Sequence, residues 1–247
     1  MSYNSFASVY DELTLNVDYK NRAEYVQSIL NRYGITDGLL LDLACGTGSM
    51  AVELSKMGYE VIATDASPDM LMEAQNKAYD NEQSIMFLCQ RMEETDLYGT
   101  VRSVVCSLDS INHLSDVDTV RKTFDTLKNF VDDKGIMVFD VNTLYKHQNV
   151  LGNNTFVYDE KNVFCVWQNH LLQDERTVNI NLDFFCKNGE LYERFNENFN
   201  ETAFTDEEII SAVESAGFRV LERLADMTEN KPDDTTERVY YVVRREY

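Results

Sequence analysis

Apolar residues along the chain follow two different patterns. Up to about residue 143, short apolar runs alternate with stretches in which apolar residues recur every three to four positions. The runs predict buried parallel strands, and the stretches predict amphipathic helices. From 144 to 204, apolar residues instead alternate with polar ones, which predicts antiparallel strands. The pattern therefore predicts an α/β core that carries a small antiparallel insertion.

The predicted core elements alternate between strand and helix. Core strands are expected at residues 39–43, 59–65, 84–90, 101–107 and 135–142. Helices are expected at residues 18–33, 49–57, 68–78 and 115–131. After the insertion, Thr205 and Glu208 form a capping-box sequence that begins a helix ending near Gly217. The last strand pair is expected at residues 219–222 and 238–243.

These elements divide the chain into three parts. Residues 1–33 form an N-terminal arm and helix, residues 34–143 and 205–247 form the core, and residues 144–204 form the insertion. Because the insertion follows the fifth strand, we expect it to cover the carboxyl edge of the sheet as a substrate lid. Trp167, Tyr158 and His170 are candidate contacts for an acceptor. The alternative is that these side chains pack one face of the small sheet or a dimer surface.

Residues 39–54 predict a ligand site. An apolar run that contains Asp42 is followed by Gly46 and Gly48, and then by a helical pattern. Glycines allow a sharp turn and close approach of a ligand, and the helix N-terminus offers unpaired N–H groups. With Ala51, the stretch also satisfies the G-x-G-x-x-G/A dinucleotide fingerprint, so NAD or FAD is an alternative. Asp42 instead favours a cofactor with a cationic group, such as the α-ammonium of S-adenosylmethionine (SAM).

Asp65 is a second candidate ligand for a nucleoside. It ends the second predicted strand, somewhat under about 20 residues after the glycines. An acid about 20 residues past such glycines can accept hydrogen bonds from ribose hydroxyls. The alternative is that it caps the next helix. Ser67, with Pro68 at the first helical position, already supplies that cap, so ribose binding is the favoured role.

The run Asp42-Leu43-Ala44-Cys45-Gly46-Thr47-Gly48 resembles the first motif of class I SAM-dependent methyltransferases. This resemblance extends over nearly the whole chain and implies SAM as the cofactor. It implies an α/β, Rossmann-like seven-stranded sheet in the order 3-2-1-4-5-7-6, with strand 7 antiparallel, and a small antiparallel β insertion. The pattern is similar to small bacterial methyltransferases and to nucleotide-sugar N,N-dimethyltransferases.

The resemblance also assigns further residues to the cofactor site. They are Ala44, Ala66, Gln90, Arg91, Met92 and Leu108. The family often has an acid after the third strand that contacts the adenine amino group, whereas this chain has Arg91. We therefore expect Gln90 or the backbone to make that contact, and Met92 to give apolar contact to the ring.

Residues on the acceptor side are also implied by resemblance. Residues 108–114 resemble a Ser-Ile-Gly-His-Leu type sequence of sugar N,N-dimethyltransferases, in which the histidine lies beside the acceptor amine. A histidine can take the proton that an amine loses, so His113 is the candidate catalytic base, with a structural role as the alternative. The Phe6-Ala7-x-x-Tyr10-Asp11 run resembles a segment that closes over the cofactor. It implies that Tyr10 lines the active site and that Tyr19 reaches the methionine end of SAM; anchoring of the arm by these rings is the alternative.

Composition narrows the partners. The formal net charge of −21 repels phosphate backbones and favours neutral or cationic small molecules, so nucleic acid is not an expected partner. The sequence contains neither a signal-peptide pattern nor an apolar run of about 18 residues, so no membrane association and a cytoplasmic location are expected. The five cysteines have no metal-binding spacing, which predicts buried free thiols and no metal site. A homodimer is left open.

Together these features predict a methyltransferase that moves a methyl group from SAM to an amine or hydroxyl of a small molecule, and a cationic or amine-bearing acceptor would suit the charge. Two other functions stay open at this point. One is an NAD-dependent oxidoreductase, and the other is a SAM-binding protein without catalysis.

Overall fold

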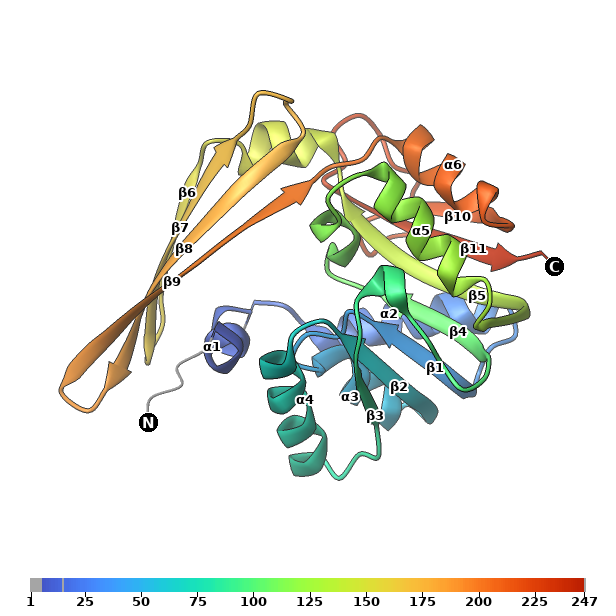
Figure 1. The fold of residues 1–247 in the computed structure, drawn as a ribbon, viewed down its shortest axis with the longest axis horizontal. Coiled ribbons are helices and arrows are strands. Elements are labelled where there is room, and N and C mark those ends of the chain that lie inside the picture. The colour runs from blue at the N-terminus through green and yellow to red at the C-terminus, as the bar shows by residue number, and fades with distance from the viewer. Residues whose placement is uncertain (1–5, 15, 247) are drawn as a thin grey trace.

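The computed structural model describes residues 6–14 and 16–246 and has a seven-stranded sheet at its centre (Figure 1). The strand order is β3-β2-β1-β4-β5-β11-β10, and β11 runs antiparallel to both of its neighbours. The predicted order 3-2-1-4-5-7-6 is therefore confirmed. The strands are β1 (Gly38–Leu43), β2 (Tyr59–Asp65), β3 (Met86–Cys89), β4 (Val101–Cys106), β5 (Val131–Asn142), β10 (Phe218–Ala225) and β11 (Arg238–Arg245).

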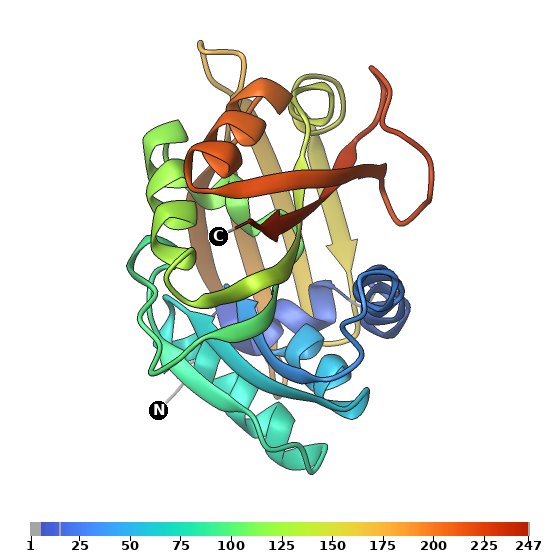
Figure 2. The same cartoon turned by 90° about the vertical axis from the view of Figure 1, so that its right-hand side faces the viewer.

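Helices cover both faces of this sheet (Figures 1 and 2). Helices α5 and α6 bury their apolar residues in one core, and α2 and α3 bury theirs in the core on the opposite face. None of the helices in the described part of the chain is both long and apolar enough to cross a membrane. The α-helices are α1 (Phe6–Leu13), α2 (Tyr19–Arg32), α3 (Ser49–Lys56), α4 (Pro68–Asp80), α5 (Val117–Leu127) and α6 (Asp206–Ser215).

The insertion forms a separate antiparallel sheet with the order β6-β7-β8-β9. Its strands are β6 (Thr155–Asp159), β7 (Val163–Leu171), β8 (Thr177–Asn188) and β9 (Leu191–Thr202). Alternation puts Ile180, Leu182 and Phe184 on a buried inner face, and Asn179 and Asn181 on the outer face. Helix α1 lies between this sheet and the rest of the molecule in Figure 1, and Val9 of α1 packs against the inner face.

A single asparagine joins the two ends of the insertion to the core. Asn112 is fully buried, and its Nδ2 donates hydrogen bonds of 3.0 Å to the carbonyls of Asn142 and Thr202. Its Oδ1 accepts a 2.9 Å bond from the Asn142 N–H. The chain therefore leaves β5 and returns from β9 at one hydrogen-bonded point. Asn112 belongs to a short 3₁₀ helix, η2 (Ser110–His113).

Several local features differ from the sequence prediction. Residues 6–13 of the predicted N-terminal arm form a helix of their own, and a π-helical segment, η3 (Lys146–Leu151), follows β5. Tyr3, Asn4 and Ser5 of the predicted N-terminal segment lie outside the described residues. The capping box of Thr205 and Glu208 is present. Three of the cysteine thiols (Cys106, Cys165 and Cys186) are buried as expected, whereas Cys89 is exposed.

Candidate functional site

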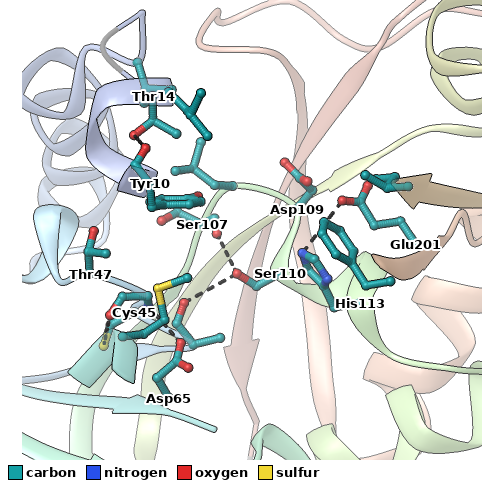
Figure 3. A pocket seen from close by; sticks show the side chains of 18 of the residues that line it. Tyr10, Thr14, Cys45, Thr47, Asp65, Ser107, Asp109, Ser110, His113 and Glu201 are labelled. Carbon is teal, nitrogen blue, oxygen red and sulfur yellow. Dashed lines mark hydrogen bonds and ion pairs between the residues drawn. The ribbon is translucent and has the colours of Figure 1, made fainter. Parts of the chain in front are cut away.

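A cavity of about 690 Å³ lies between the core and the small sheet, in the size range of small-molecule sites. One wall consists of the segments that follow β1, β2, β3 and β4, and the other wall consists of inner-face residues of β6–β9. Figure 3 shows how labelled side chains from the segments after β1, β2 and β4 lie around the cavity, with Glu201 of β9 beside His113. Of the predicted site residues, those that line the cavity are Tyr10, Tyr19, Ala44, Gly46, Asp65, Ala66, Gln90, Arg91, Met92, Leu108 and His113.

The turn after β1 forms a cradle at one end of the cavity. Ala44, Gly46 and Gly48 have φ angles of 57°, 54° and 74°, a conformation that residues with a Cβ seldom adopt. No atom lies within 4 Å of a Cβ added at Gly46, so its backbone is open to a ligand. A Cβ at Gly48 would lie 2.8 Å from the Cβ of Ala74. Gly48 therefore shapes the turn against α4 and does not line the cavity.

Asp65 is held in place by this turn. Its Oδ2 accepts a 2.8 Å hydrogen bond from the Gly46 N–H, and its Oδ1 accepts a 2.8 Å bond from the Ser67 N–H. Each carboxylate oxygen has a further lone pair, so the side chain can still accept hydrogen bonds from a ribose diol. The cradle and Asp65 thus fit the nucleoside part of SAM.

Asp42 does not have the predicted position. Its side chain is 1 % exposed, does not line the cavity, and accepts a hydrogen bond from the Ala51 backbone in the first turn of α3. Gly48, the N-cap of α3, has no side chain for this purpose, so Asp42 replaces it. Burial, together with the nearby charge of Asp65, raises the pKa of Asp42 to about 8. The expectation that Asp42 directly faces a ligand ammonium group is therefore wrong; it supports the turn from beneath.

A contact that sequence reasoning missed fastens α1 to the glycine turn. Lys77 Nζ on α4 lies 2.6 Å from Asp11 Oδ2 and 3.0 Å from Thr47 Oγ1. Thr47 Oγ1 donates a 2.7 Å hydrogen bond to Asp11 Oδ1. The sequence pattern of α4 gave no sign of this contact, because Lys77, Asp11 and Thr47 belong to three separate parts of the chain.

Side chains after β3 are engaged with one another. Gln90 uses both ends of its amide on the backbone of Asp96, at 2.9 and 3.1 Å. Arg91 Nε lies 2.6 Å from Glu93 Oε1. Because both ends of the Gln90 amide are engaged, backbone groups are the better candidates for the predicted contact with the adenine amino group. Contact of Met92 with the ring stays a prediction.

A buried carboxylate fixes the turn after β4. Leu108 and Asp109 both have positive φ angles, 58° and 54°, which is strained for residues other than glycine. Asp140, which is fully buried, accepts 2.9 Å hydrogen bonds from the N–H groups of both residues. Arg238 then bridges Asp140 and Asp109. The strained turn directs Asp109 and the following η2 segment into the cavity.

His113 shares the end of the cavity with two acids (Figure 3). Its Nε2 lies 3.8 Å from Glu201 Oε1, and its ring is tilted against Phe199 with 5.3 Å between centroids. The potential ligand atoms of Asp109, His113 and Glu201 all lie within 4.8 Å of one another. Burial lowers the pKa of His113 below its ordinary value, although Asp109 opposes this shift. The imidazole is therefore neutral near pH 7 and able to accept a proton.

Tyr10 and Tyr19 line the cavity from the N-terminal helices. Tyr19 donates a 3.3 Å hydrogen bond to Thr14 Oγ1. Burial, followed by the neighbouring Tyr19, raises the pKa of Tyr10 well above its ordinary value. The Tyr10 phenol therefore stays protonated and suits hydrogen bonding rather than proton abstraction.

Two of the three residues predicted to contact an acceptor face the cavity from the small sheet. Trp167 and Tyr158 line the cavity, and their rings are stacked with 6.2 Å between centroids. His170 is exposed on the outer face and does not line this cavity, so it is not an acceptor contact. Its place in β7 explains this, because alternate residues of a strand point to opposite faces and Trp167 is an odd number of positions away. Glu201, at the end of β9, is a lining residue that sequence reasoning missed.

Known proteins resemble this chain along its whole length. A family described as a methyltransferase domain matches residues 40–135. A provisionally named methyltransferase of Bacillus subtilis (strain 168), YqeM, is 34% identical over 99% of this chain and 98% of its own length. The crystal structure of a SAM-dependent methyltransferase from Clostridium acetobutylicum ATCC 824 is 33% identical with a TM-score of 0.88, covering 98% of both chains. The fold is also that of the sugar N-methyltransferase KedS8 from Streptoalloteichus sp ATCC 53650, with a TM-score of 0.81 and 20% identity over 100% of this chain and 96% of that one.

Replacing Asp140 should strongly destabilise the protein. Asp140→Asn leaves Arg238 with one fewer buried partner and removes an acceptor from the strained turn, so we expect a loss of about 3–5 kcal/mol in the free energy of unfolding. Denaturant titration measures it. Asp133→Asn on the same strand is the matched control, because Asp133 is exposed and its ion pair with Arg245 is long at 3.9 Å. Equal losses in the two variants would contradict the assignment.

Replacing Asp42 should remove a pH dependence of stability. Because the folded-state pKa of about 8 lies above the unfolded value of about 3.9, the folded protein binds the proton more tightly. The free energy of unfolding then falls as pH rises between these two values. Asp42→Asn cannot ionise and lacks this pH dependence. In the absence of SAM, the difference in melting temperature between the variant and the wild type should therefore shift by several degrees in favour of the variant from pH 5 to pH 8. The exposed Asp69→Asn serves as control, and parallel curves for wild type and Asp42→Asn would contradict the prediction.

Proposed function

The chain belongs to the SAM-dependent methyltransferases, and from this premise we propose that it methylates an amine or hydroxyl group of a small molecule. The acceptor occupies the part of the cavity between His113 and the small sheet. N-methylation by the fold neighbour KedS8, a sugar N-methyltransferase, agrees with an amine acceptor.

In the proposed reaction, the glycine turn and Asp65 hold SAM. The SAM sulfonium supplies an activated methyl group for in-line attack. Gly46 offers an open backbone, and Asp65 offers oxygens for the ribose hydroxyls. Asp42 holds the N-terminus of α3 in register with the turn. These residues bind and orient, and alignment of this kind accounts for a large part of the rate gain in such reactions.

One observation carries the acceptor part: His113, with a lowered pKa, lines the same cavity as the glycine turn. A neutral imidazole at this position accepts the proton that the acceptor nitrogen or oxygen loses. Asp109, within 4.8 Å of the imidazole, stabilises the resulting imidazolium. Tyr10, which stays protonated and interacts with Tyr19, lines the cavity beside the acceptor.

The cofactor assignment predicts selective binding. Isothermal titration calorimetry should give saturable heat with SAM and none with NAD at matched concentrations. Heat with NAD alone would contradict the assignment and support an oxidoreductase. Tight SAM binding together with inactivity on a broad panel of amines and alcohols would instead indicate a binding protein without catalysis.

Removal of His113 should affect turnover but not cofactor affinity. We expect His113→Ala to lower kcat by about 100-fold or more, because general-base catalysis is lost, and to leave the Kd for SAM unchanged. In the wild type, kcat should fall as the pH drops through the lowered pKa of His113, with a midpoint below the ordinary value of about 6.5. Single-turnover formation of S-adenosylhomocysteine at several pH values measures both effects.

His170→Ala provides the matched control, because His170 is an exposed histidine outside the cavity. It should leave kcat and the pH profile as in the wild type. Unchanged turnover of His113→Ala across the pH range would remove the base from the mechanism.

A further inference from the structure

The wall that the small sheet contributes to the cavity is mainly aromatic and aliphatic, and its polar groups are few. Its lining residues are Phe156, Tyr158, Cys165, Trp167, Ile180, Leu182, Phe199 and Glu201. Among these described residues Glu201 alone carries a charge. The Trp167 Nε1–H is already used, since it donates to Asn169 Oδ1. An acceptor with many hydroxyl groups would leave most of them without partners against this wall, which is unfavourable.

Most of the polar side chains of the same sheet lie on its other face. Asn179 Nδ2 donates a 2.8 Å hydrogen bond to Asn200 Oδ1, and Asn196 Nδ2 donates a 2.9 Å bond to Asn181 Oδ1. These side chains pair with one another across β8 and β9. They consequently offer nothing to a molecule in the cavity, which on this side meets mainly aromatic and aliphatic side chains.

Glu201 belongs to a cluster of buried charges. It is 6 % exposed and lies near Asp109 and His113. The cations that face it are Lys146 of η3 and Arg238 of β11. Arg238 is already paired with Asp109 and Asp140, and Lys146 Nζ donates a 2.9 Å bond to Asn142 Oδ1.

The charges of this cluster do not balance. Its acids are Asp109, Asp140 and Glu201, and its basic side chains are Lys146 and Arg238. With Glu201 ionised and His113 neutral, one negative charge is in excess. A buried excess charge is costly unless something neutralises it, and a proton or a bound monocation can do so.

We propose that Glu201 binds the ammonium group of the acceptor, and that the acceptor is a monocationic amine with an apolar body. This inference rests on the proposed methyl transfer and assigns the class of its substrate. The ammonium completes the charge balance beside Glu201 and Asp109. Trp167, Tyr158 and Phe199 contact the apolar body and the cationic head, to which aromatic faces are attracted.

The carboxylate of Glu201 then either holds a proton or binds the ammonium group, but not both. Burial, followed by the charge of Asp109, raises the pKa of Glu201 to about 8, so that near pH 7 the carboxyl group holds a proton when no cation is present. Binding of an ammonium group displaces this proton to solvent. A purely structural Glu201 would give no such coupling.

The reaction is balanced with these groups. His113 takes one proton from the bound ammonium, and the nitrogen lone pair that this exposes forms the N–CH3 bond as the S–CH3 bond breaks. The sulfonium becomes a neutral thioether, and the product leaves as a methylated ammonium ion. His113 then passes its proton to solvent.

A divalent cation is the other occupant that Asp109, His113 and Glu201 could accept, since their ligand atoms lie within 4.8 Å of one another. Charge favours the ammonium, because two positive charges beside Lys146 and Arg238 would leave the cluster with one positive charge in excess. Loss of turnover in the presence of EDTA, restored by Mg²⁺ or Zn²⁺, would therefore overturn the inference.

The first test compares acceptors and variants by formation of S-adenosylhomocysteine. The full-length wild type should methylate 2-phenylethylamine with a higher kcat/KM than 2-phenylethanol, glucosamine or glycine. Glu201→Gln should lower kcat/KM for 2-phenylethylamine by about 30-fold or more, because a buried ammonium loses its charged partner, and Glu201→Asp should recover part of this loss. Glu197→Gln is the matched control, because Glu197 lies on the same strand but does not line the cavity.

The second test measures binding without catalysis. The chain has one tryptophan, Trp167, and it lines the acceptor end, so its fluorescence reports amine binding in the presence of S-adenosylhomocysteine. The Kd for 2-phenylethylamine should rise about 30-fold or more in Glu201→Gln and stay unchanged in Glu197→Gln. Calorimetry of wild type in buffers of different ionisation enthalpy should detect proton release at pH 7. Both variants should keep the wild-type affinity for S-adenosylhomocysteine, which checks that they are folded.

These results separate the two proposals. Amine binding that depends on Glu201, without turnover, would support this inference while contradicting the proposed catalysis. Turnover of amines that Glu201→Gln leaves within twofold of the wild type, or preference for glucosamine or the alcohol, would overturn the inference while leaving methyl transfer intact.

Discussion

The buried carboxylate of Asp140 is the constraint on which the acceptor end depends. It holds two consecutive residues, Leu108 and Asp109, in a conformation that costs free energy and that no glycine relieves. Arg238, from the last strand of the chain, completes the arrangement. Because this turn orients η2, the positions of His113 and Asn112 follow from it. A contact between the middle and the end of the sequence thus sets the geometry of the site.

The cofactor end is built differently, from local features. The glycine turn, the bound carboxylate of Asp65 and the cap that Asp42 gives to α3 all lie within two strand–helix units. Lys77 adds the connection to α1 through Asp11. The cofactor end of the cavity therefore depends on a short stretch of sequence, whereas the acceptor end is assembled from elements that are distant in the sequence.

This difference explains how much could be predicted from the sequence. Strand and helix periodicity predicted the core and the antiparallel insertion, and the motif around Gly46 predicted SAM. The mistakes concern residues that were expected at the site but lie outside the cavity. Asp42 caps a helix, and Gly48 packs against α4. His170 points outward, because neighbouring residues of a strand lie on opposite faces. Glu201 could not be identified from the sequence, because β9 contains several acids. Only the pairing of β9 with β8, in which Glu201 lies two residues past Phe199, brings it near His113.

The hydrogen bonds of Asn112 have a consequence for how such proteins diversify. Since the residues at which the chain leaves and re-enters the core are both hydrogen-bonded to this one buried side chain, the strands between them can lengthen, shorten or change composition without altering the register of the central sheet. Evolution can exchange the acceptor wall as a module while the cofactor cradle is inherited unchanged. Chimeras cut at residues 142 and 202 would follow the same boundary that the fold already provides.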